Sequence, residues 1–493
     1  MGRMGTMMLV CDAEAGVCSP GRMEKRDAVV LGAGQAGKPL AVALAGAGWS
    51  VVLLERRHIG GVCVNEGCTP TKTMAAVARV AHVVRESARY GVEADTLPPQ
   101  AEIAIDMAAV RGRTQEVVTA FRRGGEKQVA RAEGVRLVRA QGRFVPGPGL
   151  VVEAEYPDGA SERFETAHVF VNVDCRPFVP DLPGLTSTPY LNSSSIMQLE
   201  EVPDHLVVLG GGYVAVEFGQ MFRRFGSRVT LIQRSERILS REDADVSLEL
   251  AGILGEEGVT VHTGCSVTGV RARSGGGVEV SVSRGDDREV VRGSHLLVAL
   301  GRIPNTENLG LEHTSIETDH RGFVKVNERL ETSVPGVYAL GDVNGGPQFT
   351  HVSYDDFRVV RANLLEGREA SVKERVVPYT VFTDPQLGRV GMTEEAARAE
   401  YGAEGILVAK LPMRHVARAI ETGETAGFMK AVVDAGTGRI LGAAILGAEG
   451  GEVMSVLQMA MMGGVTYPAI RDGVFAHPTF TESLNNLFMT LPS

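Results

Sequence analysis

The chain has 493 residues, of which 44% are hydrophobic and 22% are charged, and its formal net charge is −10. This length is too great for a single hydrophobic core and suits about three domains of an ordinary globular protein rather than a disordered or fibrous chain. The negative charge argues against nucleic acid or an anionic membrane as the main partner, and no apolar run approaches the ~18 residues that a membrane span requires.

Residues 1–26 precede the first regular pattern, and we expect them to form a disordered N-terminal extension. Their apolar stretch, Met7–Val10, ends before Asp12 and is too short for the hydrophobic region of a signal peptide. Cys11 and Cys18 could form an accessory thiol pair, although an ordinary tail is the favoured interpretation. Six cysteines in the whole chain do not form a secreted disulfide framework, so we expect a cytoplasmic protein.

Residues 27–55 follow the pattern of a strand, a glycine-rich turn, a helix and a second strand. Gly32 and Gly34 allow a tight turn that approaches a pyrophosphate closely, and Gly37 allows the helix to pack on the strand. Glu55 ends the second strand, where an acid can accept hydrogen bonds from both hydroxyls of a ribose. The combination predicts a dinucleotide-binding unit.

Cys63 and Cys68 follow this unit and are separated by four residues. Five steps of a straight helix separate two Cα atoms by about 7.5 Å, whereas a disulfide requires about 4.4 to 6.8 Å. The backbone must therefore bend between them. The glycines that allow the bend are Gly60, Gly61 and Gly67. The helical pattern from Thr71 to Arg89 places Cys68 near a helix N-terminus, which lowers the pKa of a thiol. We predict a redox-active dithiol and no metal site, because structural zinc needs four ligands.

Residues 205–234 repeat the nucleotide-binding pattern. The glycines of this second turn are Gly210 and Gly212. The position equivalent to Glu55 holds Gln233, so the acid expected of an NAD site is replaced by a neutral residue. Arg234 follows at once and suits a 2′-phosphate. We therefore predict NADPH at this second site, with NADH as the alternative.

The remaining motifs lie in the last third of the chain. An apolar strand in residues 332–342 ends in Gly341 and Asp342, which puts a carboxylate at the edge of the sheet where ligands bind. A different, mixed pattern begins near residue 376 and ends in a motif that runs from His477 to Glu482. An imidazole exchanges protons with thiols near neutral pH, and a carboxylate held against it raises its basicity.

These motifs and their order resemble those of the two-cysteine flavoprotein disulfide reductases, which include dihydrolipoamide dehydrogenase, glutathione reductase and the catalytic core of mercuric reductase. The resemblance covers residues 25–490. It implies an α/β fold with two Rossmann-like domains, for FAD and NAD(P)H, and a C-terminal α+β dimerisation domain. The FAD-binding domain would comprise 27–190 and 305–375, the NAD(P)H-binding domain 191–304, and the dimerisation domain 376–493.

The resemblance also implies roles for the residues around the dithiol. Cys63 would be the interchange thiol that meets the substrate, and Cys68 would face the flavin. Lys72 would pair with Glu217 beside the flavin. In the family, the histidine and glutamate that match His477 and Glu482 reach into the dithiol site of the partner subunit, so a homodimer would be required for activity.

The cofactor roles follow from the same resemblance. The first glycine turn would hold the ADP half of FAD, and Asp342 its ribityl chain. Tyr213 would cover the nicotinamide pocket, and Gly301 lies in the segment that resembles the return from the NAD(P)H domain to the FAD domain. One departure is Asp174, which stands where the family usually has a glycine.

We therefore expect a homodimer that passes a hydride from NADPH to FAD and two electrons on to the Cys63–Cys68 disulfide, which then reduces an acceptor. The cysteine motif is most similar to that of mercuric-reductase-like enzymes, but the C-terminal segment from Phe488 to Ser493 lacks their cysteine pair. A small disulfide, a dithiol carrier as in dihydrolipoamide dehydrogenase, or another metal ion therefore stays open as the acceptor. A non-catalytic flavin redox sensor is a further alternative, and it would not need His477 and Glu482.

Overall fold

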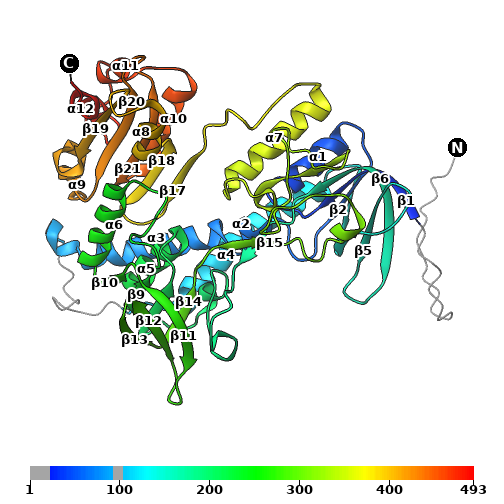
Figure 1. Ribbon diagram of the computed structural model, residues 1–493, viewed down its shortest axis with the longest axis horizontal. Coiled ribbons are helices and arrows are strands. Elements are labelled where there is room, and N and C mark those ends of the chain that lie inside the picture. Colours follow the sequence, from blue (N-terminus) through cyan, green and yellow to red (C-terminus); the bar gives the residue numbers. More distant parts are fainter. Residues whose placement is uncertain (1–22, 93–103, 493) are drawn as a thin grey trace.

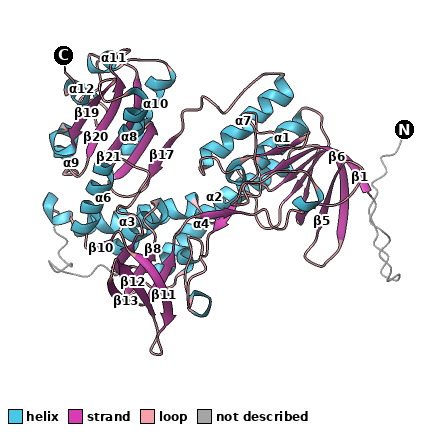
Figure 2. Ribbon diagram, in the orientation of Figure 1, coloured by secondary structure: helices cyan, strands magenta, loops and turns pink. Residues whose placement is uncertain are grey.

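The computed structural model of the protein describes residues 23–92 and 104–492 (Figure 1). The thiols Cys11 and Cys18 therefore lie outside the described residues. Within the described ranges the strands form five sheets, and helices cover the larger ones (Figure 2). None of the described helices is long and apolar enough to cross a membrane.

A seven-stranded sheet forms the first nucleotide-binding unit. Its strand order is β3-β2-β1-β6-β5-β4, and β16 pairs with β6. Residues 28–31 of the central strand β1 are all apolar and buried, as expected for parallel strands that are covered on both faces. The strands are β1 (Met23–Leu31), β2 (Val51–Leu54), β3 (Val135–Val138), β4 (Gln141–Phe144), β5 (Leu150–Glu155), β6 (Ser161–Val171) and β16 (Val337–Ala339).

Strand β1 begins at Met23, so the N-terminal extension is shorter than the expected 1–26. Residues 23–26 pair in parallel with residues 163–166 of β6. This pairing satisfies backbone donors and acceptors of β6 that would otherwise lack partners, which explains why the strand starts before the apolar stretch.

Two groups of helices accompany this sheet. Helix α1 buries Leu40, Ala41 and Leu44 and packs against α7 (Figure 1). Helices α3 and α4 pack on each other and carry the chain toward the second unit. The helices are α1 (Gly37–Gly46), α2 (Gly61–Asn65), α3 (Cys68–Arg85), α4 (Met107–Ala130) and α7 (Thr350–Glu366), and a short 3₁₀ helix, η1 (Ser87–Tyr90), follows α3.

A four-stranded parallel sheet in the order β10-β9-β8-β14 forms the second unit. An antiparallel three-stranded sheet extends it, and the short pair β7 and β15 connects it back to the first unit. The strands are β7 (Cys175–Pro177), β8 (His205–Leu209), β9 (Arg228–Ile232), β10 (Val259–His262), β11 (Ser266–Ala272), β12 (Val278–Arg284), β13 (Asp287–Gly293), β14 (His295–Val298) and β15 (Arg302–Pro304). The helices are α5 (Tyr213–Phe225) and α6 (Ala244–Glu256).

The C-terminal part is a five-stranded antiparallel sheet in the order β17-β18-β21-β20-β19, on which α10 packs. Its strands are β17 (Pro378–Val381), β18 (Gln386–Gly391), β19 (Ile406–Pro412), β20 (Phe428–Asp434) and β21 (Ile440–Gly447). Its helices are α8 (Glu394–Tyr401), α9 (Ala417–Thr422), α10 (Gly450–Met462), α11 (Tyr467–Arg471) and α12 (Ser483–Met489). Further 3₁₀ helices are η2 (Leu185–Ser187), η3 (Ser195–Gln198), η4 (Leu311–His313), η5 (Gly341–Asn344) and η6 (Met413–His415).

One hydrophobic cluster joins the parts of the molecule. It includes Met74 of α3, Phe218 of α5 and Leu446 of β21, all buried. The helix that begins at Cys68 is therefore packed against both the second unit and the C-terminal sheet. The architecture is the expected α/β fold with two Rossmann-like units and a C-terminal antiparallel sheet.

Candidate active site

The bend between Cys63 and Cys68 depends on glycine. Gly60 and Gly61, at the start of α2, have φ angles of +105° and +63°. A Cβ atom on Gly67 would lie 3.0 Å from the carbonyl oxygen of Val62. Helix α2 ends at Asn65, and α3 begins at Cys68 itself, so the two thiols come from consecutive helices rather than from one. This break is what the disulfide geometry requires.

The two thiols are chemically unequal. A hydrogen bond from the Cys63 thiol lowers the pKa of Cys68 to about 6. The hydroxyl of Thr350, whose oxygen lies 3.3 Å from the Cys68 sulfur, and the charge of Lys72 contribute to this lowering, which burial opposes. The same hydrogen bond and burial raise the pKa of the Cys63 thiol. At neutral pH the negative charge therefore resides on Cys68.

A partly buried ion pair lies one helical turn from Cys68. Lys72 of α3 places its Nζ 2.6 Å from Oε2 of Glu217 of α5, whose side chain is 4% exposed. The backbone N–H of Phe382 donates to Oε1 of Glu217 over 2.8 Å, and the Phe382 ring lies 4.7 Å from the Lys72 ammonium. Lys72 is thus held by an acid from the second unit and a ring from the C-terminal part.

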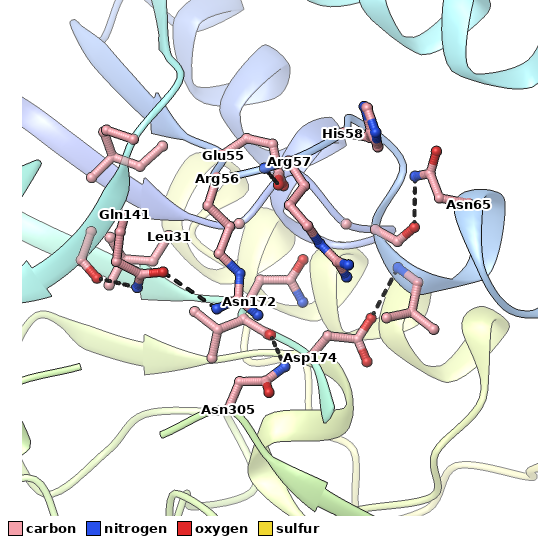
Figure 3. A pocket seen from close by; sticks show the side chains of 18 of the residues that line it. Leu31, Glu55, Arg56, Arg57, His58, Asn65, Gln141, Asn172, Asp174 and Asn305 are labelled. Atoms are coloured by element: carbon pink, nitrogen blue, oxygen red, sulfur yellow. Dashed lines mark hydrogen bonds between the residues drawn. The ribbon is translucent and has the colours of Figure 1, made fainter. Parts of the chain in front are cut away.

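The first glycine turn leaves room for a phosphate-bearing ligand (Figure 3). A Cβ atom on Gly32 would lie 2.2 Å from the carbonyl oxygen of Asn172, and one on Gly37 would lie 2.0 Å from the carbonyl oxygen of Gly32. A Cβ atom on Gly34 would lie 2.8 Å from Oδ1 of Asn172, which accepts a hydrogen bond from the Gly37 N–H. Only glycine fits at these positions.

Glu55 closes this pocket at the end of β2. Its side chain accepts hydrogen bonds from the N–H groups of Ala33 (2.9 Å) and Arg57 (2.7 Å), which fix the carboxylate at the rim. The pocket wall also includes Gly61 and Val62 of α2, next to Cys63. The glycine turn, the fixed acid and the position beside the dithiol fit the adenosine and diphosphate of FAD.

The carboxylate of Asp342 follows β16 and forms an ion pair with Arg302. Burial raises the pKa of Asp342 to about 7, and the Arg302 charge opposes that rise. Arg302 also lies 2.9 Å from Asp174, the residue found in place of the family's glycine. Asp174 keeps the left-handed backbone, with φ of +65°, and its side chain accepts the N–H of Cys175 over 2.7 Å. This local hydrogen bond explains how an aspartate adopts a glycine conformation.

The second glycine turn is built in the same way. Gly210 has φ of +120°, and a Cβ atom there would lie 2.4 Å from the carbonyl oxygen of Ala299. Gly212 precedes α5, whose first residue, Tyr213, is 37% exposed at the surface. Arg234 is exposed directly after β9, in the position that the sequence predicts. Gly301, with φ of +109°, precedes β15.

The structure does not bring His477 and Glu482 to the dithiol of the same chain. His477 Nδ1 lies 2.9 Å from Oε2 of Glu482, just before α12, and the His477 side chain is 68% exposed. Helix α12 lies at the end of the C-terminal sheet, well away from α2 (Figure 1). Within the described parts of the chain, neither residue forms a hydrogen bond to α2 or α3.

Several contacting residues were missed by the sequence analysis. Thr350 lies 282 positions from Cys68, and Phe382 lies 165 positions from Glu217, so no local pattern connects them. Arg302 directly follows Gly301, which the sequence predicts to be a cofactor-binding residue. That position was the signal by which Arg302 could have been found. Asn172 could have been suspected, because a polar residue ends the apolar strand β6.

Comparisons with known proteins agree with this geometry. Residues 26–356 match the family model for pyridine nucleotide-disulphide oxidoreductases, and residues 377–488 match the dimerisation domain of that family. The chain is 37% identical to the probable pyridine nucleotide-disulfide oxidoreductase RclA of Escherichia coli, over 94% of this chain and 99% of that protein. It is 35% identical to a mercuric reductase of Streptomyces lividans, over 95% and 96%.

Further matches extend the likeness. The chain is 31% identical to a dihydrolipoyl dehydrogenase of Haloferax volcanii, over 92% of this chain and 94% of that protein. Among solved structures it is similar to a Cu(II) complex of the HOCl-induced flavoprotein disulfide reductase RclA from Escherichia coli. That match has a TM-score of 0.84 at 36% identity and covers 95% of this chain and 99% of the other.

Proposed function

The chain belongs to the pyridine nucleotide-disulphide oxidoreductase family, and we propose that it is an NADPH-dependent flavoprotein whose Cys63–Cys68 pair reduces a thiophilic metal ion. Flavoprotein disulfide oxidoreductase activity and the use of FAD with a pyridine nucleotide come with the family, and its dimerisation domain implies a homodimer. When bound, FAD supplies the transfer of two electrons from the nicotinamide to the Cys63–Cys68 disulfide.

The arrangement of the two thiols, which come from consecutive helices with the Lys72–Glu217 ion pair one helical turn beyond Cys68, is the observation that carries the proposal. Cys68, with its pKa of about 6, is the thiolate that would face the flavin, and Cys63 keeps its proton until an acceptor arrives. The Lys72 ammonium, held by Glu217, stabilises the negative charge on Cys68. Cys63 lies in α2, after Gly61 and Val62 of the first nucleotide pocket, and its role as the thiol that meets the substrate rests on the family resemblance.

The reduced Cys63–Cys68 pair can supply two electrons to either class of acceptor. The Cys63 thiol and the Cys68 thiolate together reduce Hg(II) to Hg(0), or two Cu(II) ions to two Cu(I) ions, with formation of the Cys63–Cys68 disulfide and release of the Cys63 proton. With a small disulfide, Cys63 forms a mixed disulfide and expels one thiol, and Cys68 then displaces the second thiol from Cys63. The partner subunit's His477, oriented by its Glu482, would carry the proton in both cases.

The similar proteins favour a metal ion over a small disulfide as the acceptor. A similar solved structure is a Cu(II) complex of the Escherichia coli reductase, and mercuric reductases are among the similar proteins. Soft thiolate ligands suit Cu(I) and Hg(II). The likeness to dihydrolipoyl dehydrogenases supports lipoamide as the second candidate.

An anaerobic acceptor screen tests the proposal. NADPH consumption would be followed with Cu(II), with Hg(II) and excess thiol, with lipoamide and with oxidised glutathione, and Cys63→Ser would measure the background. We expect kcat/KM for a metal ion to exceed that for lipoamide about tenfold or more, which equals about 1.4 kcal/mol of barrier. A faster rate with lipoamide would make the protein a dihydrolipoamide dehydrogenase, and no NADPH consumption with any acceptor would favour a redox sensor.

A further inference from the structure

Asp356 is a buried acid that none of the chemistry above uses. It lies in α7 and is 1% exposed. Its Oδ2 accepts hydrogen bonds from the backbone N–H of Gly341 (2.8 Å) and from Nδ2 of Asn344 (3.2 Å). Gly341 and Asn344 are the first and last residues of η5, the turn that carries Asp342. A single carboxylate oxygen thus holds both ends of this turn.

The other oxygen of Asp356 is fixed by Arg375. Oδ1 accepts a hydrogen bond from Nη2 of Arg375 over 2.7 Å. Arg375 lies in the segment between α7 and β17 that leads into the C-terminal sheet, and its side chain is 13% exposed. Burial raises the pKa of Asp356, and the hydrogen bond from Gly341 and the Arg375 charge oppose that rise. These donors therefore favour the carboxylate form, which accepts all three hydrogen bonds.

Packing holds one side of the turn, where Val343 is fully buried in a hydrophobic cluster. A cavity of about 310 Å³ lies behind it. Its wall includes Asn344, Gly346 and Pro347 from the turn and its continuation, and Asp356 and Arg375 from the other side. A segment that borders a cavity on one side has room to shift, because few atoms oppose its movement there. On the cavity side, the hydrogen bonds to Asp356 therefore supply the restraint.

We infer that Asp356, held by Arg375, is a positioning residue for FAD: it fixes the Gly341–Asn344 turn so that the Asp342 carboxylate is preorganised for the ribityl chain. The inference rests on the proposed role of Asp342 in the flavin site. A group that must meet a ligand within a fraction of an ångström depends on neighbours that hold it. Asp356 is such a neighbour, with no contact to the ligand required.

The test is FAD affinity, measured by flavin fluorescence as purified holoenzyme is diluted. Asp356→Leu keeps the volume and apolar packing but removes both acceptors, so we expect FAD affinity to fall about 10- to 100-fold. Asp356→Asn keeps an oxygen for the Gly341 N–H and should recover part of that loss. The matched control is Asp355→Asn: Asp355 also pairs with Arg375, with Nε 2.9 Å from its Oδ2, but it has no hydrogen bond to the turn. Its FAD affinity should equal that of the parent.

A merely structural role is separated by melting temperature. If Asp356 only stabilises the fold, Asp356→Leu lowers the melting temperatures of the FAD-bound and FAD-stripped proteins equally, and the inference is overturned. A positioning role predicts a smaller rise in melting temperature on FAD addition. If Asp356→Leu does not fold, Asn344→Ala decides, since it removes one end of the same restraint: weaker FAD binding supports the inference, and unchanged binding overturns it.

Asp342→Asn tests the role of Asp342 in FAD binding separately from the role of Asp356. Weak FAD binding by Asp342→Asn with parental binding by Asp356→Leu would reject the role of Asp356 alone. Parental binding by Asp342→Asn would reject the proposed role of Asp342, and with it the reason for positioning the turn.

Discussion

Lys72 and Glu217 form a contact of 2.6 Å between the helix that starts at Cys68 and the helix that starts at Tyr213. The pair therefore connects the thiol that carries the negative charge with the helix at the second nucleotide turn. Both charges act on Cys68 in opposite senses: Lys72 lowers its pKa and Glu217 raises it. The net effect on the thiolate can be tested by changing each charge separately.

Lys72→Met should raise the pKa of Cys68, because the nearby positive charge is lost while Glu217 remains. Glu217→Gln should lower that pKa, since the amide is neutral and similar in size. The measurement is a pH titration of the long-wavelength thiolate-to-flavin absorbance of the two-electron-reduced enzyme. Shifts of the two variants in the same direction would show that the charges do not act on Cys68 in this way.

The parent enzyme should show the same absorbance at neutral pH and lose it as the pH falls through about 6, the pKa of Cys68. The sign follows from the lowered pKa: the thiolate is the form present above it, and protonation below it removes the donor. Cys63→Ser should keep the absorbance and abolish turnover, whereas Cys68→Ser should lose the absorbance. The opposite pattern would reverse the proposed roles of the thiols.

Arg224 should make a large contribution to stability. Its side chain is 6% exposed and pairs with Glu257 (2.7 Å) and Asp384 (2.5 Å), which joins α5 to the C-terminal part. Arg224→Met should lower the free energy of unfolding by about 3 to 5 kcal/mol in urea denaturation, because Glu257 loses its ion-pair partner and Asp384 is left with Arg79. As a control, Arg111→Ala breaks an exposed pair with Glu200 and should cost less than about 1 kcal/mol.

The ion pair between Arg224 and Asp384 also predicts how stability depends on pH. The Arg224 and Arg79 charges and hydrogen bonds outweigh burial and lower the pKa of Asp384. Its contribution to stability is therefore full above the ordinary pKa of an aspartate and is lost as the pH falls through the lowered value. Arg224→Met should show less loss of stability than the parent on acidification below pH ~4. An equal loss in both proteins would place the acid sensitivity elsewhere.

Local patterns in the sequence predicted the elements of the site well, because glycine conformations and helix starts depend on neighbouring residues. The turn at Gly32 and the bend before Cys68 are of this kind, whereas α3 runs from Cys68 to Arg85 rather than over the expected Thr71 to Arg89. Contacts between distant segments, such as Thr350 with Cys68 or Asp356 with Gly341, depend on tertiary packing and left no periodic signal. The start of β1 was misplaced for the same reason, since it depends on pairing with β6.

The choice of nucleotide is tested at Arg234, which is exposed after β9 beside the neutral Gln233. We expect kcat/KM for NADPH to exceed that for NADH in the parent. Arg234→Ala should lower kcat/KM for NADPH by an amount that corresponds to about 1.5 to 3 kcal/mol, the contribution of a charge-assisted contact to the 2′-phosphate. The kcat/KM for NADH should be nearly unchanged. Equal values for the two nucleotides in the parent would remove the basis of this assignment.

The last prediction concerns His477, which pairs with Glu482 just before α12, a helix well away from α2 (Figure 1). His477→Ala should slow the disulfide half-reaction by about 10² to 10⁴, the usual effect of general acid–base catalysis, and leave flavin reduction by NADPH little changed in stopped-flow absorbance. If the histidine acts in the partner's site, mixing Cys63→Ser and His477→Ala subunits should restore activity. Random exchange makes half of the dimers mixed, and each mixed dimer has one site with both parental residues, so recovery should approach a quarter of parental activity. Verified mixed dimers without activity would place His477 outside this chemistry.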